Sequence, residues 1–154
     1  MRSINHAITG ALIGLTINDA AISVPVSFGS HYVLDAVPHF DFKKGSKEIG
    51  LTKFNILLII DGILSILLVA IIAIFRPHHW PVAIVCAFLA SSPDLFNLNR
   101  YIRTLKKQSW HPNIYSRLAK KIQWFERPIG AVVEIVWLTA ASILLAIYLA
   151  NPHT

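Results

Sequence analysis

Charged residues are scarce in this chain, and acidic residues are fewer than basic ones. Only 14% of the 154 residues are charged, with 8 Asp or Glu against 14 Lys or Arg, whereas soluble domains usually carry about 25%. Apolar residues make up 55% of the chain, and the mean hydropathy of +0.57 is positive. This composition excludes an ordinary water-soluble domain and predicts a membrane protein whose residues 1–154 form a single domain.

Cysteine is almost absent, and no cleavage signal is visible near the N-terminus. The one cysteine, Cys86, lies in an apolar run and cannot form an internal disulfide, so the redox compartment stays open. One basic residue precedes the first apolar stretch, but His6 and Asn18-Asp19 interrupt that stretch and no small-residue cleavage site follows. We therefore expect the N-terminal segment to belong to the mature fold, with no secretory signal peptide.

Three apolar runs have the length of membrane spans. Residues 54–75 contain Asp61 as their only charge, and residues 129–149 contain only Glu134. Residues 80–96 are at the short end of the length needed to cross about 30 Å of hydrocarbon. We predict a membrane helix for each of these runs.

The region over residues 6–38 is less regular. Its first part, residues 6–17, would rise less than about 20 Å as a helix and is too short to cross alone. Its second part, residues 20–38, is long enough, although Pro25 is expected to bend it. We predict a helical hairpin that turns at Asn18-Asp19, with the first helix sheltered by its neighbours. A single bent span is the alternative.

These segments together predict an all-α fold, namely a polytopic bundle of about five membrane helices. Under this arrangement 13 of the 14 Lys and Arg residues fall on one side, and only Arg76 falls on the other. The positive-inside rule then predicts an inner (cytoplasmic) membrane protein with its N-terminus in the cytoplasm and its C-terminus outside. The topology explains the net charge of +6, because the basic residues lie in the connections on one side of the membrane. We therefore expect no nucleic-acid partner.

The longest connection, residues 97–128, is basic and contains a helical pattern. Apolar residues recur there at helical spacing while basic residues take the other faces: Ile114, Leu118, Ile122 and Phe125, with Arg117, Lys120 and Lys121. Such a segment is typical of an amphipathic helix lying in the headgroup layer. It is either a plain topology determinant or also a site for anionic lipid headgroups, which makes membrane lipids the expected partners.

The ionisable residues of the spans gather toward one leaflet. Charged groups inside a membrane are costly and are therefore candidates for function. His31 and Asp35, four residues apart, share one helix face. Pro38 then turns the chain, which lets His39 and Asp41 fold back toward that face. Imidazoles and carboxylates are common zinc ligands, whereas a salt bridge or a helix cap is the structural alternative.

Further ionisable residues are expected at the same end. His6 opens the first helix, and Asp94 follows the turn-forming pair Ser92-Pro93. With the cluster they complete the set of predicted metal ligands, which is His6, His31, Asp35, His39 and Asp94. Asp61 and Glu134 either orient a ligand imidazole or pair with an Arg on a neighbouring helix.

The run from His6, through His31-x-x-x-Asp35-x-x-Pro38-His39-x-Asp41, to Ser92-Pro93-Asp94 resembles a known family. It is similar to the bacterial and archaeal membrane-bound metal-dependent hydrolases of the LexA-regulated inner-membrane type, over residues 5–98 and more weakly around Glu134. The His-x-x-x-Asp element also resembles a short stretch of zinc-dependent phospholipase C, although the N-terminal tryptophan ligand of those enzymes is absent. The resemblance implies a divalent-metal hydrolase.

We therefore expect hydrolysis of a phosphoester at the cytoplasmic membrane surface, with a lipid headgroup among the candidate substrates. Zinc is the expected metal, with manganese or iron as alternatives, and it would make bound water nucleophilic. Asp41 or Glu134 would accept the proton as the catalytic base. Two rivals are a small transporter or ion relay, and a non-catalytic scaffold with a structural metal. A transporter would distribute polar residues through the membrane depth, whereas the outer halves of these spans are nearly free of charge.

Overall fold

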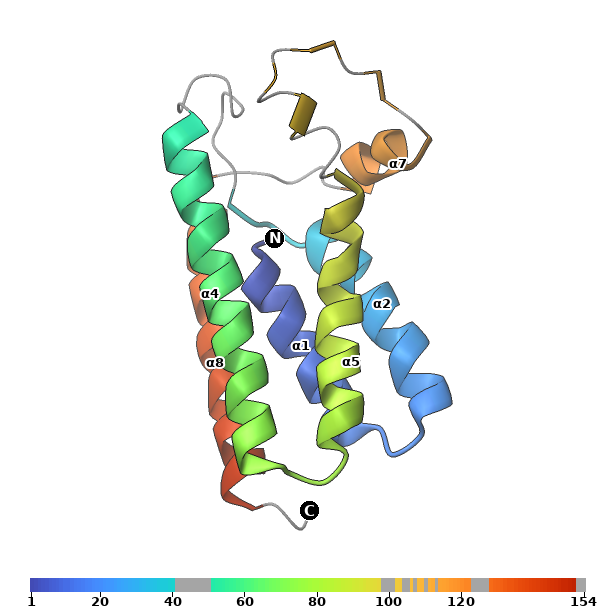
Figure 1. Cartoon of the computed structure of the whole chain (residues 1–154), viewed down its shortest axis with the longest axis vertical. Coiled ribbons are helices and arrows are strands. Elements are labelled where there is room, and N and C mark those ends of the chain that lie inside the picture. Colours follow the sequence, from blue (N-terminus) through green and yellow to red (C-terminus); the bar gives the residue numbers. More distant parts are fainter. Residues whose placement is uncertain are drawn as a thin grey trace.

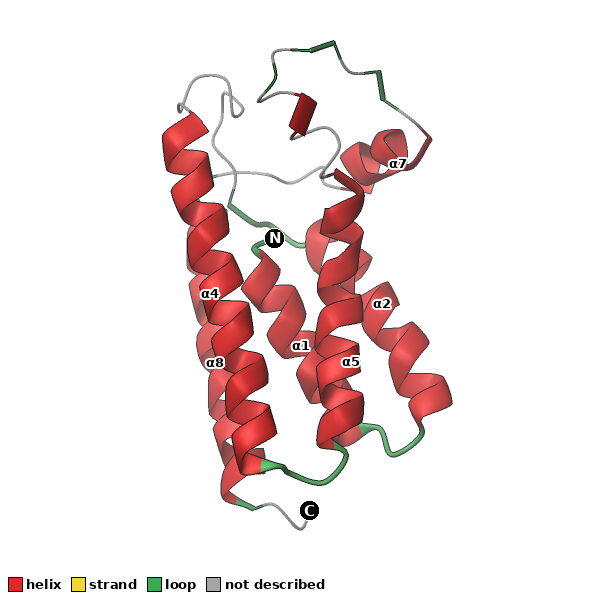
Figure 2. Cartoon of the chain, in the orientation of Figure 1, coloured by secondary structure: helices red, strands yellow, loops and turns green. Residues whose placement is uncertain are grey.

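The computed structural model of the chain describes residues 1–40, 51–97, 102–103, 106, 108–109, 111–112, 114–122 and 128–151. Within these residues every element is a helix, which confirms the predicted all-α class (Figures 1 and 2). The five long helices of the bundle are α1 (Ser3–Thr16), α2 (Ala20–Ala36), α4 (Leu51–Phe75), α5 (Trp80–Ser91) and α8 (Gly130–Ala150). A 3-10 helix, η1 (Ser92–Asn97), continues α5, and the short α7 (Ile114–Ile122) packs against α2.

The N-terminal segment forms the predicted helical hairpin. α1 and α2 are separate helices joined by residues 17–19, so the alternative of a single bent span is wrong. Asp19 caps α2, because its carboxylate accepts the backbone N–H of Ala21 at 2.8 Å. Pro25 lies inside α2, which continues past it to Ala36.

α1 is the central helix of the bundle (Figure 1). It packs against each of the other four long helices, most extensively against α5, as expected for a helix too short to cross a membrane alone. With 14 residues it rises about 21 Å. Its buried residues are Ile4, Asn5, His6, Ala7, Ile8, Gly10, Ala11, Gly14 and Leu15. The apolar core of the molecule is therefore built around α1.

α1 and α5 meet backbone to backbone. A Cβ atom at Gly10 would overlap the carbonyl oxygen of Cys86, and one at Gly14 would overlap the backbone of Ala83. Cys86 and Ala83 are small and fully buried. Glycines four residues apart, opposite small residues, are typical of close helix packing in membranes. This contact holds the end of α5, and with it η1, close to the first turns of α1.

The outer faces of α4 and α8 are apolar. The segments Asn55–Phe75 and Gly130–Ala150 are long and apolar enough to cross a membrane, whereas Trp80–Phe96 is apolar but shorter. Large side chains on both helices are exposed, with Ile74 at 75% and Ile135 at 65%. Apolar surface of this extent is typical of contact with lipid or with another protein. These two helices indicate an association with a membrane.

α7 corresponds to the predicted amphipathic helix. Ile114 is 85% exposed at its start, and Arg117 and Lys121 are exposed as well. The helix lies across the end of the bundle at which η1 ends (Figure 1). The last apolar position of the predicted pattern, Phe125, lies outside the described residues.

The contact between α1 and α5 gives a first test of the packing. We expect Gly10→Ala to lower the free energy of unfolding by about 1–3 kcal/mol, because the added Cβ would force the two helices apart. Gly62→Ala in α4 is the matched control, because nothing lies within 4 Å of a Cβ at that position. Denaturant unfolding of both variants in detergent measures the difference. Equal stability of the two variants would contradict the close packing.

Candidate metal site

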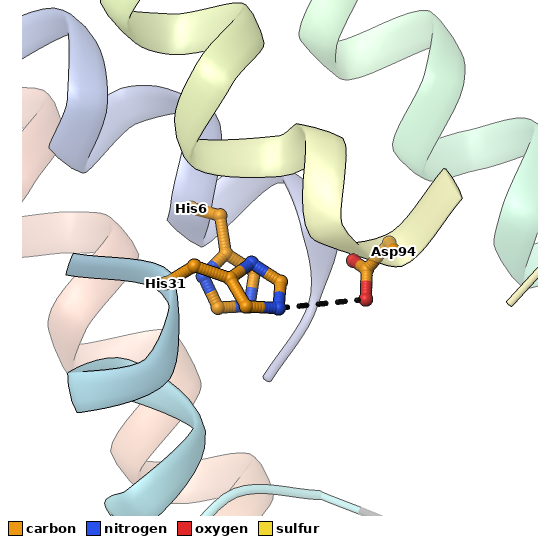
Figure 3. Close-up of side chains that lie close together, drawn as sticks. All are labelled: His6, His31 and Asp94. Atoms are coloured by element: carbon orange, nitrogen blue, oxygen red, sulfur yellow. Dashed lines mark ion pairs between the residues drawn. The ribbon is translucent and has the colours of Figure 1, made fainter. Parts of the chain in front are cut away.

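Three helices bring two histidines and a carboxylate to one point. His6 comes from the first turns of α1, His31 from α2 and Asp94 from η1 (Figure 3). Each side chain offers one ligand atom, and these three atoms lie within 4.8 Å of one another. A group of this composition can hold a metal ion. The prediction that His6, His31 and Asp94 lie together is therefore confirmed.

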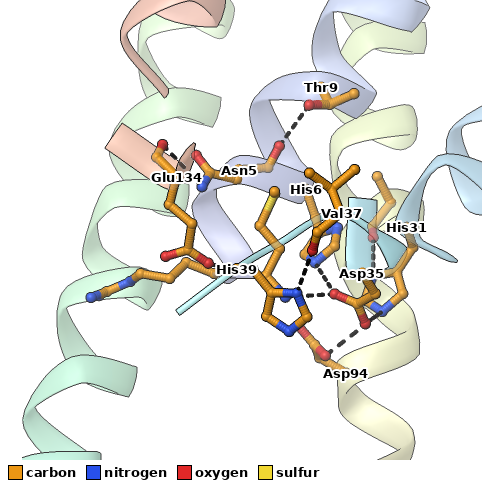
Figure 4. Close-up of polar contacts among 12 residues, drawn as sticks. Asn5, His6, Thr9, His31, Asp35, Val37, His39, Asp94 and Glu134 are labelled. Atoms are coloured by element: carbon orange, nitrogen blue, oxygen red, sulfur yellow. Dashed lines mark hydrogen bonds and ion pairs between the residues drawn. The ribbon is translucent and has the colours of Figure 1, made fainter. Parts of the chain in front are cut away.

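Asp35 bridges the two imidazoles. Its Oδ1 lies 3.2 Å from Nε2 of His6, and its Oδ2 lies 3.3 Å from Nε2 of His31 (Figure 4). The second contact follows from the four-residue spacing on α2, which puts both residues on one face. Nε2 of His31 also lies 3.8 Å from Oδ1 of Asp94. One ring nitrogen of His31 thus faces two carboxylates.

A hydrogen bond determines which ring nitrogen of His31 is available. Its Nδ1 lies 2.8 Å from the carbonyl oxygen of Ala90, and because a carbonyl can only accept, Nδ1 carries the proton. In the neutral ring, Nε2 then keeps its lone pair on the side of Asp35 and Asp94. Metal-bound histidines commonly have this arrangement, in which the other ring nitrogen donates to a backbone carbonyl. The His31 ring is therefore oriented as a ligand would be.

His6 has no orienting hydrogen bond. Both of its ring nitrogens are buried and lack a hydrogen-bond partner among the described residues, since the contact to Asp35 does not have hydrogen-bond geometry. The ring stacks on His31 instead, with centroids 4.0 Å apart and planes inclined by 24°. Leaving a buried polar group unpaired costs about 1–3 kcal/mol. An ion bound at a nitrogen of His6 would remove this cost.

The site is closed on one side and open on the other. His6 is fully buried, and His31 and Asp35 are each 3% exposed. The side chain of Asp94, by contrast, is 40% exposed. Catalytic metal sites differ from structural ones by keeping a position open to water. The exposed edge at Asp94 supplies such an approach.

The α-ammonium group of Met1 also reaches the site. It donates to Oδ1 of Asp35 at 2.6 Å. Asp35 therefore contacts one ammonium group and two imidazoles. The polar contacts that join α1 to α2 converge on this single carboxylate.

His39 is buried beside the site but does not belong to the group of His6, His31 and Asp94 (Figure 4). Its Nδ1 lies 2.8 Å from the carbonyl oxygen of Val37. The His39 backbone packs on the start of α8, where a Cβ atom at Gly130 would overlap it. The ligand role of His39 stays a prediction, and Asp41 lies outside the described residues.

Asp61 and Glu134 contact Arg2. Nε of Arg2 donates to both carboxylate oxygens of Asp61, at 3.0 and 3.2 Å. The backbone N–H of Arg2 donates to Oε1 of Glu134 at 2.9 Å. Of the two roles predicted for these acids, pairing with an Arg of a neighbouring helix is confirmed for Asp61. Glu134 binds the same residue through its backbone, and its role as a catalytic base stays a prediction.

Two residues beside the site, Arg2 and Asn5, have no predicted role in it. Asn5 is fully buried, and its Nδ2 donates to the backbone carbonyl of Glu134 at 3.4 Å (Figure 4). The sequence does indicate that a basic partner is needed, because two long apolar runs each contain one acid and no base. Arg2 directly precedes α1.

No protein-family model matches the sequence, and no curated protein or solved structure is significantly similar to it. The resemblance to membrane-bound metal-dependent hydrolases therefore stays a prediction that rests on the quoted residues. The function of the site has to be inferred from its own geometry and chemistry.

The two carboxylates differ in burial, which predicts different costs of removing their charge. In the metal-free protein, Asp35→Asn should lower the free energy of unfolding by up to about 3–5 kcal/mol, because the Met1 ammonium loses its counter-charge beside a buried side chain. Asp94→Asn should lower it by about 1 kcal/mol or less, because water stabilises a side chain that is 40% exposed. Denaturant unfolding of these isosteric variants measures both values. A larger loss in Asp94→Asn would show that Asp35 is not the centre of the ion-pair network.

Proposed function

We propose that the chain is a multi-pass inner-membrane protein in which α1, α2, α4, α5 and α8 form one membrane bundle. Apolar side chains on the outside of the shorter helices support this, since Ile22 and Val33 of α2 and Phe88 of α5 are more than half exposed, at 52%, 67% and 61%. Together with α4 and α8 they give the bundle apolar surface on several flanks, which lipid stabilises. The positive-inside rule gives the orientation, with the N-terminus in the cytoplasm and the C-terminus outside.

The site of this bundle binds a divalent metal ion, with zinc favoured over manganese or iron. His6, His31 and Asp94 would hold the ion, together with Asp35. The observation that carries this proposal is the pair of imidazoles: Nε2 of His31 is available because Nδ1 is bonded to Ala90, and His6 is buried with no hydrogen-bond partner in the described structure. Two imidazoles with carboxylates form a donor set that suits zinc.

The proposed reaction is hydrolysis of a phosphoester at the cytoplasmic membrane surface. When bound, the metal would supply a Lewis acid that activates water and polarises the phosphoryl group. The residues of the chain would exclude water on the buried side at His6 and admit the substrate on the exposed side at Asp94. Asp41 and Glu134 are the proposed proton acceptors, and Glu134 already accepts the N–H of Arg2 with one oxygen.

Membrane lipids are the proposed partners, and a phosphoester in a lipid headgroup is the proposed substrate. α7 carries the exposed Arg117 and Lys121, and it packs on α2 as η1 does. Positive charge at this position favours anionic headgroups. A headgroup bound by α7 would therefore lie near the open side of the site at Asp94.

One observation favours an ion relay or transporter as the second candidate function. Ser23 and Ser27 continue the series of His31 and Asp35 along α2 at four-residue spacing, and both are fully buried. Their hydroxyl groups have no hydrogen-bond partner within the described part of the chain. The buried face of α2 is thus polar over most of its length. This polar face extends farther from the site than the ionisable residues of α2 do.

Metal content tests the site directly. Wild-type protein that is purified in detergent, incubated with zinc and desalted should retain about one ion per chain by elemental analysis. His6→Ala and His31→Ala should each lose the ion, because each removes a buried ligand. His78→Ala is the matched control, because this exposed histidine lies in the connection between α4 and α5 at the opposite end of the bundle (Figure 1).

Retention of zinc in both ligand variants, or no retention by the wild type with zinc, manganese or iron, would overturn the metal proposal. His39→Ala belongs in the same series, because loss of the ion in this variant would add His39 to the ligands. Its retention would assign His39 to packing against the start of α8 at Gly130.

Turnover separates the hydrolase from its rivals. Metal-loaded wild type in phospholipid vesicles should release headgroup products, since water adds its oxygen to phosphorus and a proton passes to the leaving alcohol. Asp94→Asn should lower this rate by about 10–100-fold, because it removes the charge of the exposed ligand. Phosphorus NMR of the vesicles measures the products, with chelator-treated protein as the control. Bound metal without turnover would favour the scaffold, and metal movement into sealed vesicles would favour the relay.

A further inference from the structure

Arg2 joins three helices beside the candidate metal site. On the side of α4, its Nε binds both carboxylate oxygens of Asp61, and its Nη2 donates to the carbonyl of Leu57 at 3.3 Å. On the side of α8, its backbone N–H donates to Glu134 at 2.9 Å. Asp61 and Glu134 are 8% and 5% exposed. Arg2 is therefore clamped between one buried acid on each of the two longest helices.

The clamp continues into the turn that carries His6. The carbonyl oxygen of Arg2 accepts the backbone N–H of Asn5 at 3.0 Å and that of His6 at 3.4 Å. The side chain of Asn5 donates to the backbone carbonyl of Glu134 at 3.4 Å. The position of the first turn of α1 thus depends on bonds to α4 and α8, although neither helix contributes to the group of His6, His31 and Asp94.

His6 needs such positioning more than the other histidines do. The rings of His31 and His39 are each held by a backbone carbonyl, whereas the ring of His6 has no hydrogen-bond partner among the described residues. Besides the backbone from which it extends, the ring is located by its stacking on His31 and by the 3.2 Å contact with Asp35. Groups that orient metal ligands typically change metal affinity by about 10–100-fold when they are removed.

We propose that Arg2 and Asp61 are positioning residues that set the metal affinity of the site through the placement of His6. This inference rests on the proposed function, because it requires that His6 be a metal ligand. A purely structural clamp would also satisfy the two buried acids, but it would leave metal affinity unchanged in any variant that folds.

Metal titration of the full chain in detergent separates these two roles. The dissociation constants for zinc and the visible absorption of the cobalt form are measured for wild type, Arg2→Met, Arg2→Lys and Asp61→Asn. We expect Arg2→Met and Asp61→Asn to bind zinc about 10–100-fold more weakly and to change the cobalt bands, because His6 is displaced. The conservative Arg2→Lys, which keeps the charge beside Asp61, should recover at least part of the affinity.

Two further variants sharpen the test. Arg76→Met is the matched control, because Arg76 lies at the other end of α4, beside Trp80, and should leave affinity unchanged. The double variant Arg2→Met/Asp61→Asn should bind zinc no more weakly than either single variant, because both changes break one interaction. Thermal unfolding of each metal-free variant shows whether it is folded.

Folded Arg2→Met and Asp61→Asn proteins that bind zinc as tightly as Arg76→Met would overturn this inference and leave the metal proposal intact. If Arg2→Met does not fold, Arg2→Lys and Asp61→Asn decide the question in the same way. Loss of folding in all three variants would overturn the inference in favour of a structural clamp. Absence of metal binding in the wild type would overturn the proposed function and this inference together.

Discussion

Backbone contact between α1 and α5 determines how the other parts of the molecule are arranged. Because Gly10 and Gly14 have no side chains, α5 lies directly on the central helix, and η1 follows close to the first turns of α1. The same contact places the Ala90 carbonyl against His31. The same contact therefore fixes both the packing of small residues in the apolar interior and the geometry of the polar site. A shift of α5 along α1 would change both.

The ionisable side chains of the site and most of the exposed apolar surface come from different helices. α1, α2 and η1 contribute the group of ionisable side chains, whereas α4 and α8 offer most of the exposed apolar surface. In surroundings of low dielectric constant, each buried charge requires a partner. The structure meets this need with two pairs that start from adjacent residues of the chain, Met1 with Asp35 and Arg2 with Asp61. The two residues that precede α1 thus pair with an acid of α2 and an acid of α4.

The features that could be predicted from the sequence are those that depend on spacing along one segment. The break at residues 17–19 predicts a hairpin with a sheltered first helix, and four-residue spacing puts His31 and Asp35 on one face. The particular residues that pair between helices could not be predicted, because they depend on the height and rotation of each helix. The pair of Arg2 and Asp61, which are 59 residues apart in the chain, is an example. Hydropathy also supports fewer spans than the sequence predicts, because within the described residues only α4 and α8 combine sufficient length with apolar composition.

The flanks of the bundle differ in height. The apolar segments of α4 and α8 each have 21 residues, or about 32 Å, whereas α2 has 17 residues, or about 26 Å. In the proposed membrane bundle this difference would be a hydrophobic mismatch on the flank of α2, which lipid would relieve by thinning locally or by tilting the protein. Thinning beside α2 would lower the headgroups toward the helix that carries His31 and Asp35. Acyl-chain length would then govern how closely the membrane surface approaches the site, and the protein would respond to the thickness of the bilayer that surrounds it.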